Sequence, residues 1–431
     1  MSLPVSEQTK AILLLTAPLI VGKPQRDGPK ILTPTEYNKL AARLMELKRQ
    51  PVDLLGNERD ELVHNLADTL DSERLFHLLD RGLLMSQAID QWQSRGIWIV
   101  SRADATYPKR LKAKLKQQAP PILFGCGEPS LLEQGGLGIV GSRKVDDAIS
   151  EFVENAARLA SNSGYSVVSG GARGVDQIAM STALDVEGTV VGALAENLNR
   201  AVVSSQYRNA LRSHSLVLIS AVDPSAGFNV GNAMARNKLI YALSDAGLVA
   251  NADYEKGGTW AGAIEQINRL KCCPVYVRTT ERTPKGNKAL IERGAHPWPN
   301  PTGMTDFRAL LETPPETAQA VEAQELDFNA EPAVTETKAK PQFEEKKTPT
   351  SSPVEKTAVK LPAEEIYSAA KQAMLTLLKE RSMNETDLTD ALGVVKSQTR
   401  AWLEILLQEG LVEKTKRPVR YNVKIPEQEL F

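Results

Sequence analysis

The sequence predicts an α/β protein built on a parallel sheet, and two observations lead to that prediction. The first is a strand, turn and helix unit that begins at Gly138 and repeats once before residue 185. The second is a set of unbroken apolar runs at 189–194, 216–220, 247–252 and 273–277, which is typical of parallel strands covered by helices on both faces. Together they indicate a sheet of at least six strands.

The repeated unit carries two glycine-rich turns, each directly after a predicted strand. They contribute Gly141, Ser142, Arg143 and Lys144, and then Ser169, Gly170, Gly171, Ala172, Arg173 and Gly174. Neighbouring parallel strands end at one edge of a sheet, where backbone N–H groups, helix N-termini and arginines favour anions such as phosphates. A single turn of this kind is more often only a tight connection, but two turns that both carry arginine favour an anion site.

A second candidate stretch lies between the strands expected at 216–220 and 247–252. It combines an aromatic residue, two amides and two cations before a helix expected at 239–243, namely Phe228, Asn232, Arg236, Asn237 and Lys238. Cations suit phosphate oxygens, amides suit base or sugar edges, and phenylalanine stacks on bases, so the mixture fits single-stranded nucleic acid. It is equally explained if Asn237 caps a helix and Phe228 fills the core.

A third glycine turn, at Gly257 and Gly258, follows the next strand. The first two turns, with 236–244, 285–291 and Gly294-Ala295, resemble in order and spacing the DNA-processing A (DprA/Smf) family. The third turn departs from that family, which usually has Ser-Gly-Ser and Thr-Ala there. Residues 107–111 and 120–127 are similar to the segments that join the helical and sheet domains in that family. Met180 stands where the family commonly has His, and Gly171 where it has Leu, which marks a divergent member.

The resemblance implies an extended Rossmann-like domain in which the glycine turns and the cationic stretch bind single-stranded DNA. It also implies a homodimer, no cofactor, and a possible partner in a RecA-type recombinase that the protein helps to load. The divergent positions argue against the recombinase-loading role more than against the binding pocket. Arg143, Arg173 and Lys238 are expected around one cationic pocket at the carboxyl edge of the sheet.

The predicted domain organisation has four parts. Leucines at three- and four-residue intervals predict a helical domain over 1–96, where a helix-hairpin-helix turn at 78–82 competes with simple helix packing. The Rossmann-like domain is expected at 97–312, and the composition of 313–360 predicts a flexible linker. Three helices and a basic hairpin at 361–431 predict a winged helix. Its candidate groove-facing residues are Ser397, Gln398, Thr399 and Arg400, and such a module binds either duplex DNA or protein.

An enzymatic alternative rests on Gly257, Gly258 and Glu265. They are similar to the loop of nucleotide-cleaving phosphoribohydrolases, in which the glutamate acts on ribose, although the spacing here is longer by one residue. No nucleophile and base arrangement is visible, and His214 and His296 have no nearby partner in sequence. We therefore expect a binding protein without catalytic residues, and the alternative is a nucleotide-sensing or nucleotide-cleaving regulator acting through the winged helix.

Composition limits the partners and the compartment. The 431 residues carry a formal net charge of −1, so nucleic acid must be met by local cationic clusters. The run at 109–116 is one candidate, and a solvated helix face explains it equally well. The three cysteines, Cys126, Cys272 and Cys273, have no metal-ligand spacing, and their sparse, odd number argues against a disulfide framework and for the cytoplasm. The apolar run at 11–15 is too short to span a bilayer, so no membrane association is expected.

Overall fold

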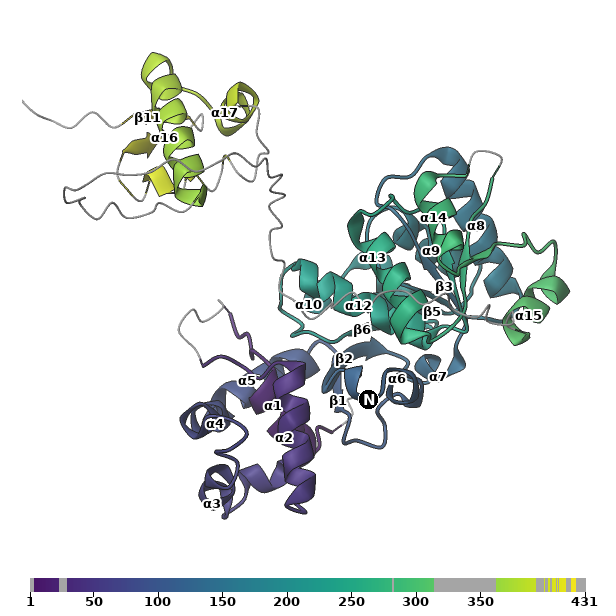
Figure 1. Cartoon of the computed structure of the whole chain (residues 1–431), viewed down its shortest axis with the longest axis horizontal. Helices are drawn as coiled ribbons and strands as arrows, with labels where there is room; N and C mark the ends of the chain where they lie inside the picture. Colours follow the sequence, from purple (N-terminus) through teal and green to yellow (C-terminus); the bar gives the residue numbers. More distant parts are fainter. Residues whose placement is uncertain are drawn as a thin grey trace, which may run out of the picture. The chain divides into compact units, whose positions relative to one another are not determined.

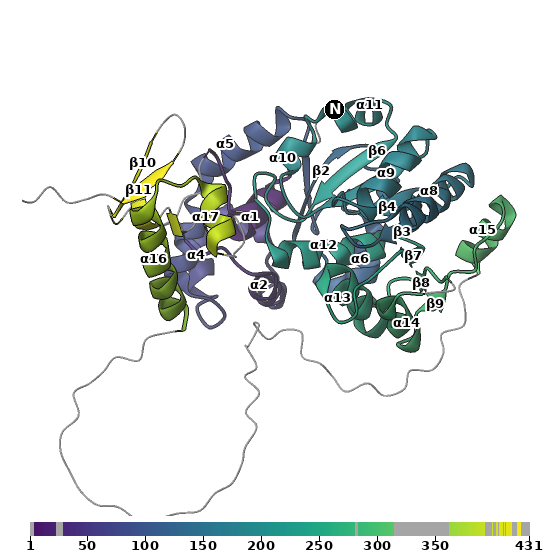
Figure 2. The same ribbon diagram turned by 90° about the horizontal axis from the view of Figure 1, so that it is seen from above.

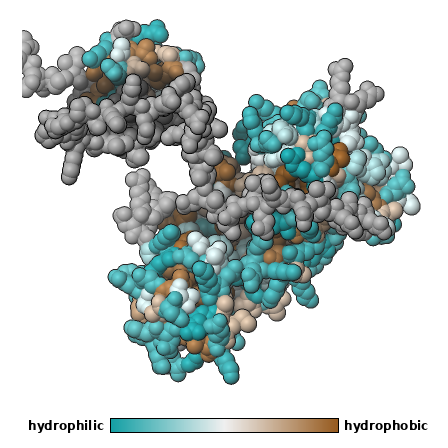
Figure 3. Space-filling view, viewed as in Figure 1, coloured by the Kyte–Doolittle hydropathy of each residue, from teal (hydrophilic) through white to brown (hydrophobic). Residues whose placement is uncertain are grey.

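The computed structural model describes residues 4–22, 29–280, 283–313 and 362–392, together with 399, 402–403, 405–407, 409, 411–415 and 420–423. The chain divides into two compact units, Met1–Leu326 and Asp327–Phe431. The face of the molecule in Figure 3 is mainly hydrophilic, with apolar residues in small patches. Across the described residues, no helix has the length and apolar character needed to cross a membrane.

The first unit is built on a nine-stranded sheet in the order β1-β2-β6-β5-β4-β3-β7-β8-β9. Several of these strands are labelled in Figure 1. The strands are β1 (Trp98–Ser101), β2 (Ile122–Gly127), β3 (Leu137–Val140), β4 (Val167–Ser169), β5 (Val190–Leu194), β6 (Leu216–Ser220), β7 (Ala246–Val249), β8 (Val275–Val277) and β9 (His296–Pro297). All pairs from β6 to β9 are parallel, whereas β1 and β2 form an antiparallel edge. The predicted α/β class is confirmed as a mixed fold with a large, mostly parallel sheet.

Helices cover both faces of this sheet, because alternate strand residues feed two separate cores (Figure 2). Ile139, Leu218 and Leu248 pack on the side of α8 (Asp147–Asn162) and α9 (Val175–Asp185). Val140, Val217 and Val249 pack on the side of α6 (Lys109–Leu115), α12 (Val230–Leu243), α13 (Gly257–Glu265) and α14 (Lys285–Glu292). The remaining elements are η2 (Lys116–Gln118), α7 (Leu131–Gln134), α10 (Leu198–Ala201), α11 (Ser205–Arg212), the π-helix η3 (Gln266–Leu270) and α15 (Met304–Glu312).

The N-terminal residues are helical, as the leucine spacing predicts. They form α1 (Glu7–Thr16), α2 (Pro34–Glu46), the 3-10 turn η1 (Pro51–Leu55), α3 (Arg59–His64), α4 (Ser72–Leu79) and α5 (Gly82–Gln93). Their apolar side chains join the core on one face of the sheet, where Trp92 meets Phe124 of β2 edge to face at 5.0 Å. Arg81, in the turn between α4 and α5, donates to the carbonyls of Leu14 and Ala17, and burial lowers its pKa to about 10. The turn therefore packs against α1, which favours the packing explanation over a helix-hairpin-helix.

The second unit contains the first two helices and the hairpin expected of a winged helix. These are α16 (Pro362–Glu380), α17 (Glu385–Leu392) and the antiparallel strands β10 (Val412–Lys414) and β11 (Tyr421–Val423). Met374, Leu388, Trp402 and Tyr421 share its core, and Thr399 is also buried. Ser397, Gln398 and Arg400 lie outside the described residues, as do all but the first residue of the predicted linker over 313–360 and the hairpin tip at 416–419. The winged helix and the four-part domain division remain predictions.

Candidate nucleic-acid interface

The two glycine turns lie side by side at the carboxyl edge of the sheet, because β3 and β4 are parallel neighbours. The backbone N–H of Val175 donates to the carbonyl oxygen of Ser142 at 3.3 Å. A Cβ atom on Gly174 would lie 2.6 Å from that oxygen, and the φ of Gly174 is 82°, so only glycine permits this approach without strain. The predicted meeting of the two turns at one edge is therefore present in the structure.

A third loop, which follows β7, closes the site. β7 lies on the other side of β3 from β4, so the strand order reverses here, as it does at the ligand crevice of open α/β sheets. Asn251 Oδ1 accepts the N–H of Ser142 at 2.9 Å, and the Thr259 hydroxyl donates to the Gly141 carbonyl at 2.9 Å. Sequence reasoning missed these two residues, although the place of Asn251 just after a strand is a usable signal.

Phe228 reaches the first turn from the loop between β6 and α12. Its side chain is 50% exposed, and the guanidinium carbon of Arg143 lies 5.3 Å from the centre of its ring. The explanation that Phe228 fills the core is therefore wrong. Around this pair, Lys144 and Arg173 are also exposed, as are Gly257 and Gly258. The structure thus brings together cations, one exposed aromatic ring and exposed backbone from four separate loops, which follow β3, β4, β6 and β7.

The cationic stretch after Phe228 is arranged differently from the prediction. Asn229 caps α12 by accepting the N–H of Gly231 at 2.7 Å, so the helix begins at Val230 and not at residue 239. Asn232, Arg236, Asn237 and Lys238 consequently lie on the helix, where successive side chains point in different directions. Asn237 caps nothing, and its Nδ2 instead donates to the Gly258 carbonyl at 3.0 Å.

Lys238 does not join Arg143 and Arg173 in one pocket, so that part of the prediction is wrong. Its Nζ lies 3.1 Å from Glu265 Oε1, and Arg269 Nη2 lies 3.0 Å from the same oxygen. Lys238 also donates to Gln118 Oε1 at 3.3 Å. The physical reason is its position on α12, which carries it two turns past the loop and toward α13. The same ion pairs engage Glu265, the residue on which the enzymatic alternative depends.

Arg236 and Asp176 form a buried ion pair beneath the second turn. Their closest atoms, Nη1 and Oδ2, are 3.1 Å apart, and the side chains are 11% and 5% exposed. Burial raises the pKa of Asp176, while Arg236 and the backbone N–H groups of Ala172 and Gly170 act in the opposite direction. A Cβ atom on Gly170 would lie 1.4 Å from Arg236 Nη1, so the missing side chain is what admits the guanidinium.

Two residues of the second turn are therefore structural, and not contacts for a ligand. Ser169 and Gly170 are both buried, and the Ser169 hydroxyl donates to the Ile139 carbonyl at 2.7 Å. Gly171, with a φ of 67°, would place a Cβ atom 2.8 Å from Leu194 Cδ2, which explains why a larger residue is absent. The exposed part of this turn is Arg173.

The helix N-termini at this edge differ in what they offer an anion. Asp146 caps α8 by accepting the N–H of Ile149 at 2.8 Å, and Asp147 lies in the first turn of the same helix. Asp176 lies in the first turn of α9. These carboxylates offset the positive helix ends that were expected to attract phosphates. By contrast, α13 begins at Gly257 with no side-chain cap and with Gly257 and Gly258 exposed.

Part of the cationic run at 109–116 packs against neighbouring segments of the chain. Arg110 pairs with Asp245, Lys112 donates to the Arg102 carbonyl at 3.2 Å, and Lys114 donates to the Ser244 carbonyl at 2.7 Å. Burial also lowers the pKa of Lys114. Arg110 and Lys114 thus hold neighbouring segments of the chain together, whereas Lys109 and Lys112 are exposed, as expected of a solvated helix face.

Comparison with known proteins assigns this domain to a family. Residues 98–308 match the family model of DNA recombination-mediator protein A. This domain belongs to the DprA/Smf family.

Two curated relatives show how far the match extends. Protein Smf of Synechocystis sp. is 29% identical over 177 residues, which are 40% of this chain and 44% of that protein. The DNA processing protein DprA of Bacillus subtilis is 23% identical over 188 residues, which are 43% of this chain and 62% of that protein. The chain thus spans about half the length of the curated relatives it matches. The X-ray structure of DprA from Streptococcus pneumoniae aligns with a TM-score of 0.54 over 72% of this chain and 98% of that one, at 18% identity, which shows a shared fold.

The buried ion pair generates a stability prediction. Arg236→Met should lower the free energy of unfolding by about 3 kcal/mol, because it leaves Asp176 buried without its cation. The pKa of Asp176 in the folded protein should then rise further. When the pKa of a carboxyl group is higher in the folded than in the unfolded protein, the protein loses stability as the pH rises above the unfolded-state pKa. Urea unfolding of Arg236→Met should accordingly show greater stability near pH 4.5 than near pH 7.

The matched control is Arg158→Met, which removes an exposed arginine from α8 and should leave stability nearly unchanged. Adding Asp176→Asn to Arg236→Met should restore part of the loss and flatten the pH dependence. Equal stability of Arg236→Met and the wild type at pH 7 would contradict the structural role of the pair.

Proposed function

We propose that this DprA/Smf domain binds single-stranded DNA across the carboxyl edge of its sheet and acts in DNA recombination, transformation or the processing of foreign DNA. The observation that carries the proposal is the convergence of Arg143 and Phe228, which are 85 positions apart in sequence and stacked in the fold. Family membership of residues 98–308 supports the same function.

The chemistry of the edge suits an unpaired strand. Arg143, Lys144 and Arg173 are exposed and can bind phosphate oxygens, and the uncapped start of α13 adds backbone donors. Phe228 presents an aromatic face to a base, and stacking of that kind needs a base that is not already stacked in a duplex. Binding requires no bond to be made or broken, so this function needs no catalytic residue.

The further partners follow from the family resemblance. We propose a homodimer, a RecA-type recombinase as the protein that receives the DNA, and the cytoplasm as the compartment. The second unit, as a winged helix, would bind duplex DNA or a protein.

A second candidate function is nucleotide sensing or cleavage, and the uncapped glycine turn at Gly257 and Gly258 favours it. The two functions differ in how affinity depends on ligand length. A DNA-binding edge should bind oligo-dT increasingly tightly as the oligomer lengthens and should release no free base from nucleoside monophosphates. Tight binding of one mononucleotide, or release of its base, would favour the second function.

Arg143→Ala tests the placement of the DNA. It should weaken binding of oligo-dT about tenfold at low salt, because one charged contact to phosphate is lost. The slope of log affinity against log salt should fall by about 0.7. Fluorescence anisotropy over a range of salt concentrations measures both quantities.

Two controls accompany this variant. Arg212→Ala removes an exposed arginine from the end of α11, at the opposite edge of the sheet, and should leave affinity unchanged. Deletion of all residues after Lys360 should weaken binding less than Arg143→Ala does. If the deletion abolishes binding and Arg143→Ala leaves affinity and slope intact, the second unit is the DNA-binding element and the placement is wrong.

Phe228→Ala tests stacking separately from charge. It should cost about 1 to 3 kcal/mol of binding free energy to oligo-dT, with little change in salt slope, because no charge is removed. The melting temperature should stay close to that of the wild type, since the ring is 50% exposed. Phe228→Trp should restore the affinity. Equal losses in Phe228→Ala and Phe228→Trp would argue against base stacking.

The molecular mass in solution tests whether the chain forms a homodimer. Multi-angle light scattering of the full chain at micromolar concentration should give twice the chain mass of 47.1 kDa. The chain that ends at Lys360 should also dimerise, because the proposed contact belongs to the DprA/Smf domain. A strict monomer in both samples would remove the proposal.

A further inference from the structure

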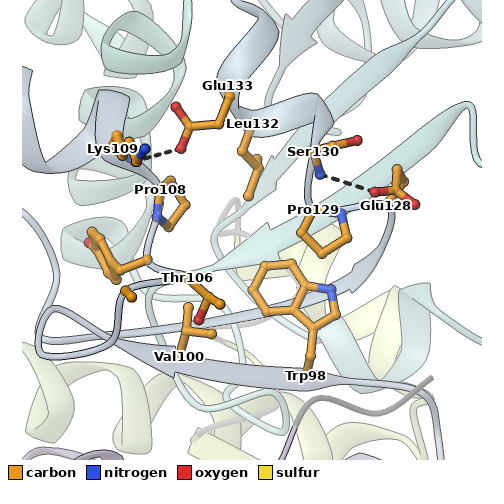
Figure 4. Close-up of a pocket in the computed structure, with 12 residues that line it drawn as sticks. Trp98, Val100, Thr106, Pro108, Lys109, Glu128, Pro129, Ser130, Leu132 and Glu133 are labelled. Atoms are coloured by element: carbon orange, nitrogen blue, oxygen red, sulfur yellow. Dashed lines mark hydrogen bonds between the residues drawn. The ribbon is translucent and has the colours of Figure 1, made fainter.

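A pocket of about 310 Å³ opens beside the antiparallel edge of the sheet, away from the glycine turns (Figure 4). β2 ends at Gly127, whose partner Val217 lies near the beginning of β6. The residues that follow Gly127 therefore line the pocket at the amino edge of the parallel strands. The candidate DNA interface lies at their carboxyl edge, on the loops that follow β3, β4, β6 and β7.

Apolar side chains form most of the wall. Trp98 and Val100 of β1 lie on one side, and Pro108, Pro129 and Leu132 face them (Figure 4). The indole ring lies over Gly125, where a Cβ atom would be 2.2 Å from Trp98 Cζ2. Its N–H donates to the Gly127 carbonyl at 3.2 Å, so the ring is held in place before any ligand arrives. An aromatic ring bordered by two prolines makes a preformed apolar slot.

The rim carries more negative than positive charge. Glu128 and Glu133 are the two carboxylates among the lining residues, and Lys109 is the one cation. Hydrogen bonds from the side chain and backbone of Ser130, followed by His214, lower the pKa of Glu128, so this group stays ionised at neutral pH. Glu133 Oε1 accepts the backbone N–H of Lys109 at 2.6 Å, which fixes that carboxylate at the mouth.

We propose that this pocket binds a short basic peptide segment of a protein partner. An apolar or proline side chain enters between Pro108 and Pro129 onto the Trp98 indole, and a neighbouring lysine or arginine of the segment meets Glu128 and Glu133. The volume lies at the small end of ligand pockets and suits about two residues of a peptide. Aromatic slots of this kind recognise extended proline-containing segments. The carboxylates repel phosphates, which separates this surface from the DNA interface and favours a protein partner over a nucleic acid.

The test monitors the fluorine resonance of Trp98 while each of two peptides is added. The full chain is labelled with 5-fluorotryptophan, and the Trp98 fluorine resonance is assigned from its absence in Trp98→Phe. The probe is the capped peptide Lys-Leu-Pro-Lys, compared with the capped peptide Gln-Leu-Pro-Gln. We expect the basic peptide to shift the Trp98 resonance saturably and to bind more tightly than the neutral one.

Charge-neutral variants then distinguish the contribution of the carboxylates to peptide affinity from that of the apolar slot. Glu128→Gln combined with Glu133→Gln keeps both hydrogen-bond acceptors and should weaken the basic peptide about fivefold or more, while the neutral peptide changes by less than about twofold. Glu151→Gln, at an exposed position of α8, is the matched control and should change neither affinity. Circular dichroism melting confirms that the double variant is folded.

Three outcomes would overturn the proposal. The Trp98 resonance could remain unmoved by the basic peptide, or affinity could be insensitive to the double change. Alternatively, oligo-dT could shift the Trp98 resonance more strongly than the peptide does, which would make the pocket part of a nucleic-acid surface. None of these outcomes bears on the Arg143 experiment, so the two proposals fail separately.

Discussion

The buried ion pair between Arg236 and Asp176 is the interaction on which the geometry of the carboxyl edge depends. It fixes α12 against the start of α9, and it occupies the space left by the missing side chain of Gly170. Charges this deeply buried are costly unless they stay paired, so the second turn has one stable position relative to α12. That position in turn sets where Gly174 meets the first turn and where Arg173 is exposed.

Around this constraint, the charged residues divide into two groups by what they contact. Arg236, Lys238 and Arg110 each pair with a carboxylate of the chain and hold helices together. Arg143 and Arg173 lie on turns and are exposed. Because Asp146 and Asp176 offset the starts of α8 and α9, attraction for an anion at this edge comes mainly from side chains and from α13, and less from the helix dipoles that flank the first two turns.

The two edges of the sheet carry opposite chemistry. The carboxyl edge gathers exposed cations around Phe228, and the pocket at the amino edge has Glu128 and Glu133 at its mouth. A strand of DNA and a basic peptide would each be repelled from the other site, and neither would need to leave for the other to bind. If both proposals hold, the domain can engage DNA and a protein at the same time.

The sequence by itself determined the elements and the edge at which the glycine turns meet. Apolar runs such as 216–220 identify buried strands without knowledge of their partners, and parallel strands bring successive turns to one edge. Only the tertiary structure decided what each polar side chain does. The true start of α12 was not recognised in the sequence, because Asn229, Gly231 and Asn232 are residue types common in loops. Only the structure shows that Asn229 caps the helix. Lys238 and Glu265 lie 27 positions apart and meet only because α12 packs on α13. Which cations stay exposed is therefore a consequence of packing, and so is the pocket beside Trp98, since its walls come from segments joined only in the folded sheet.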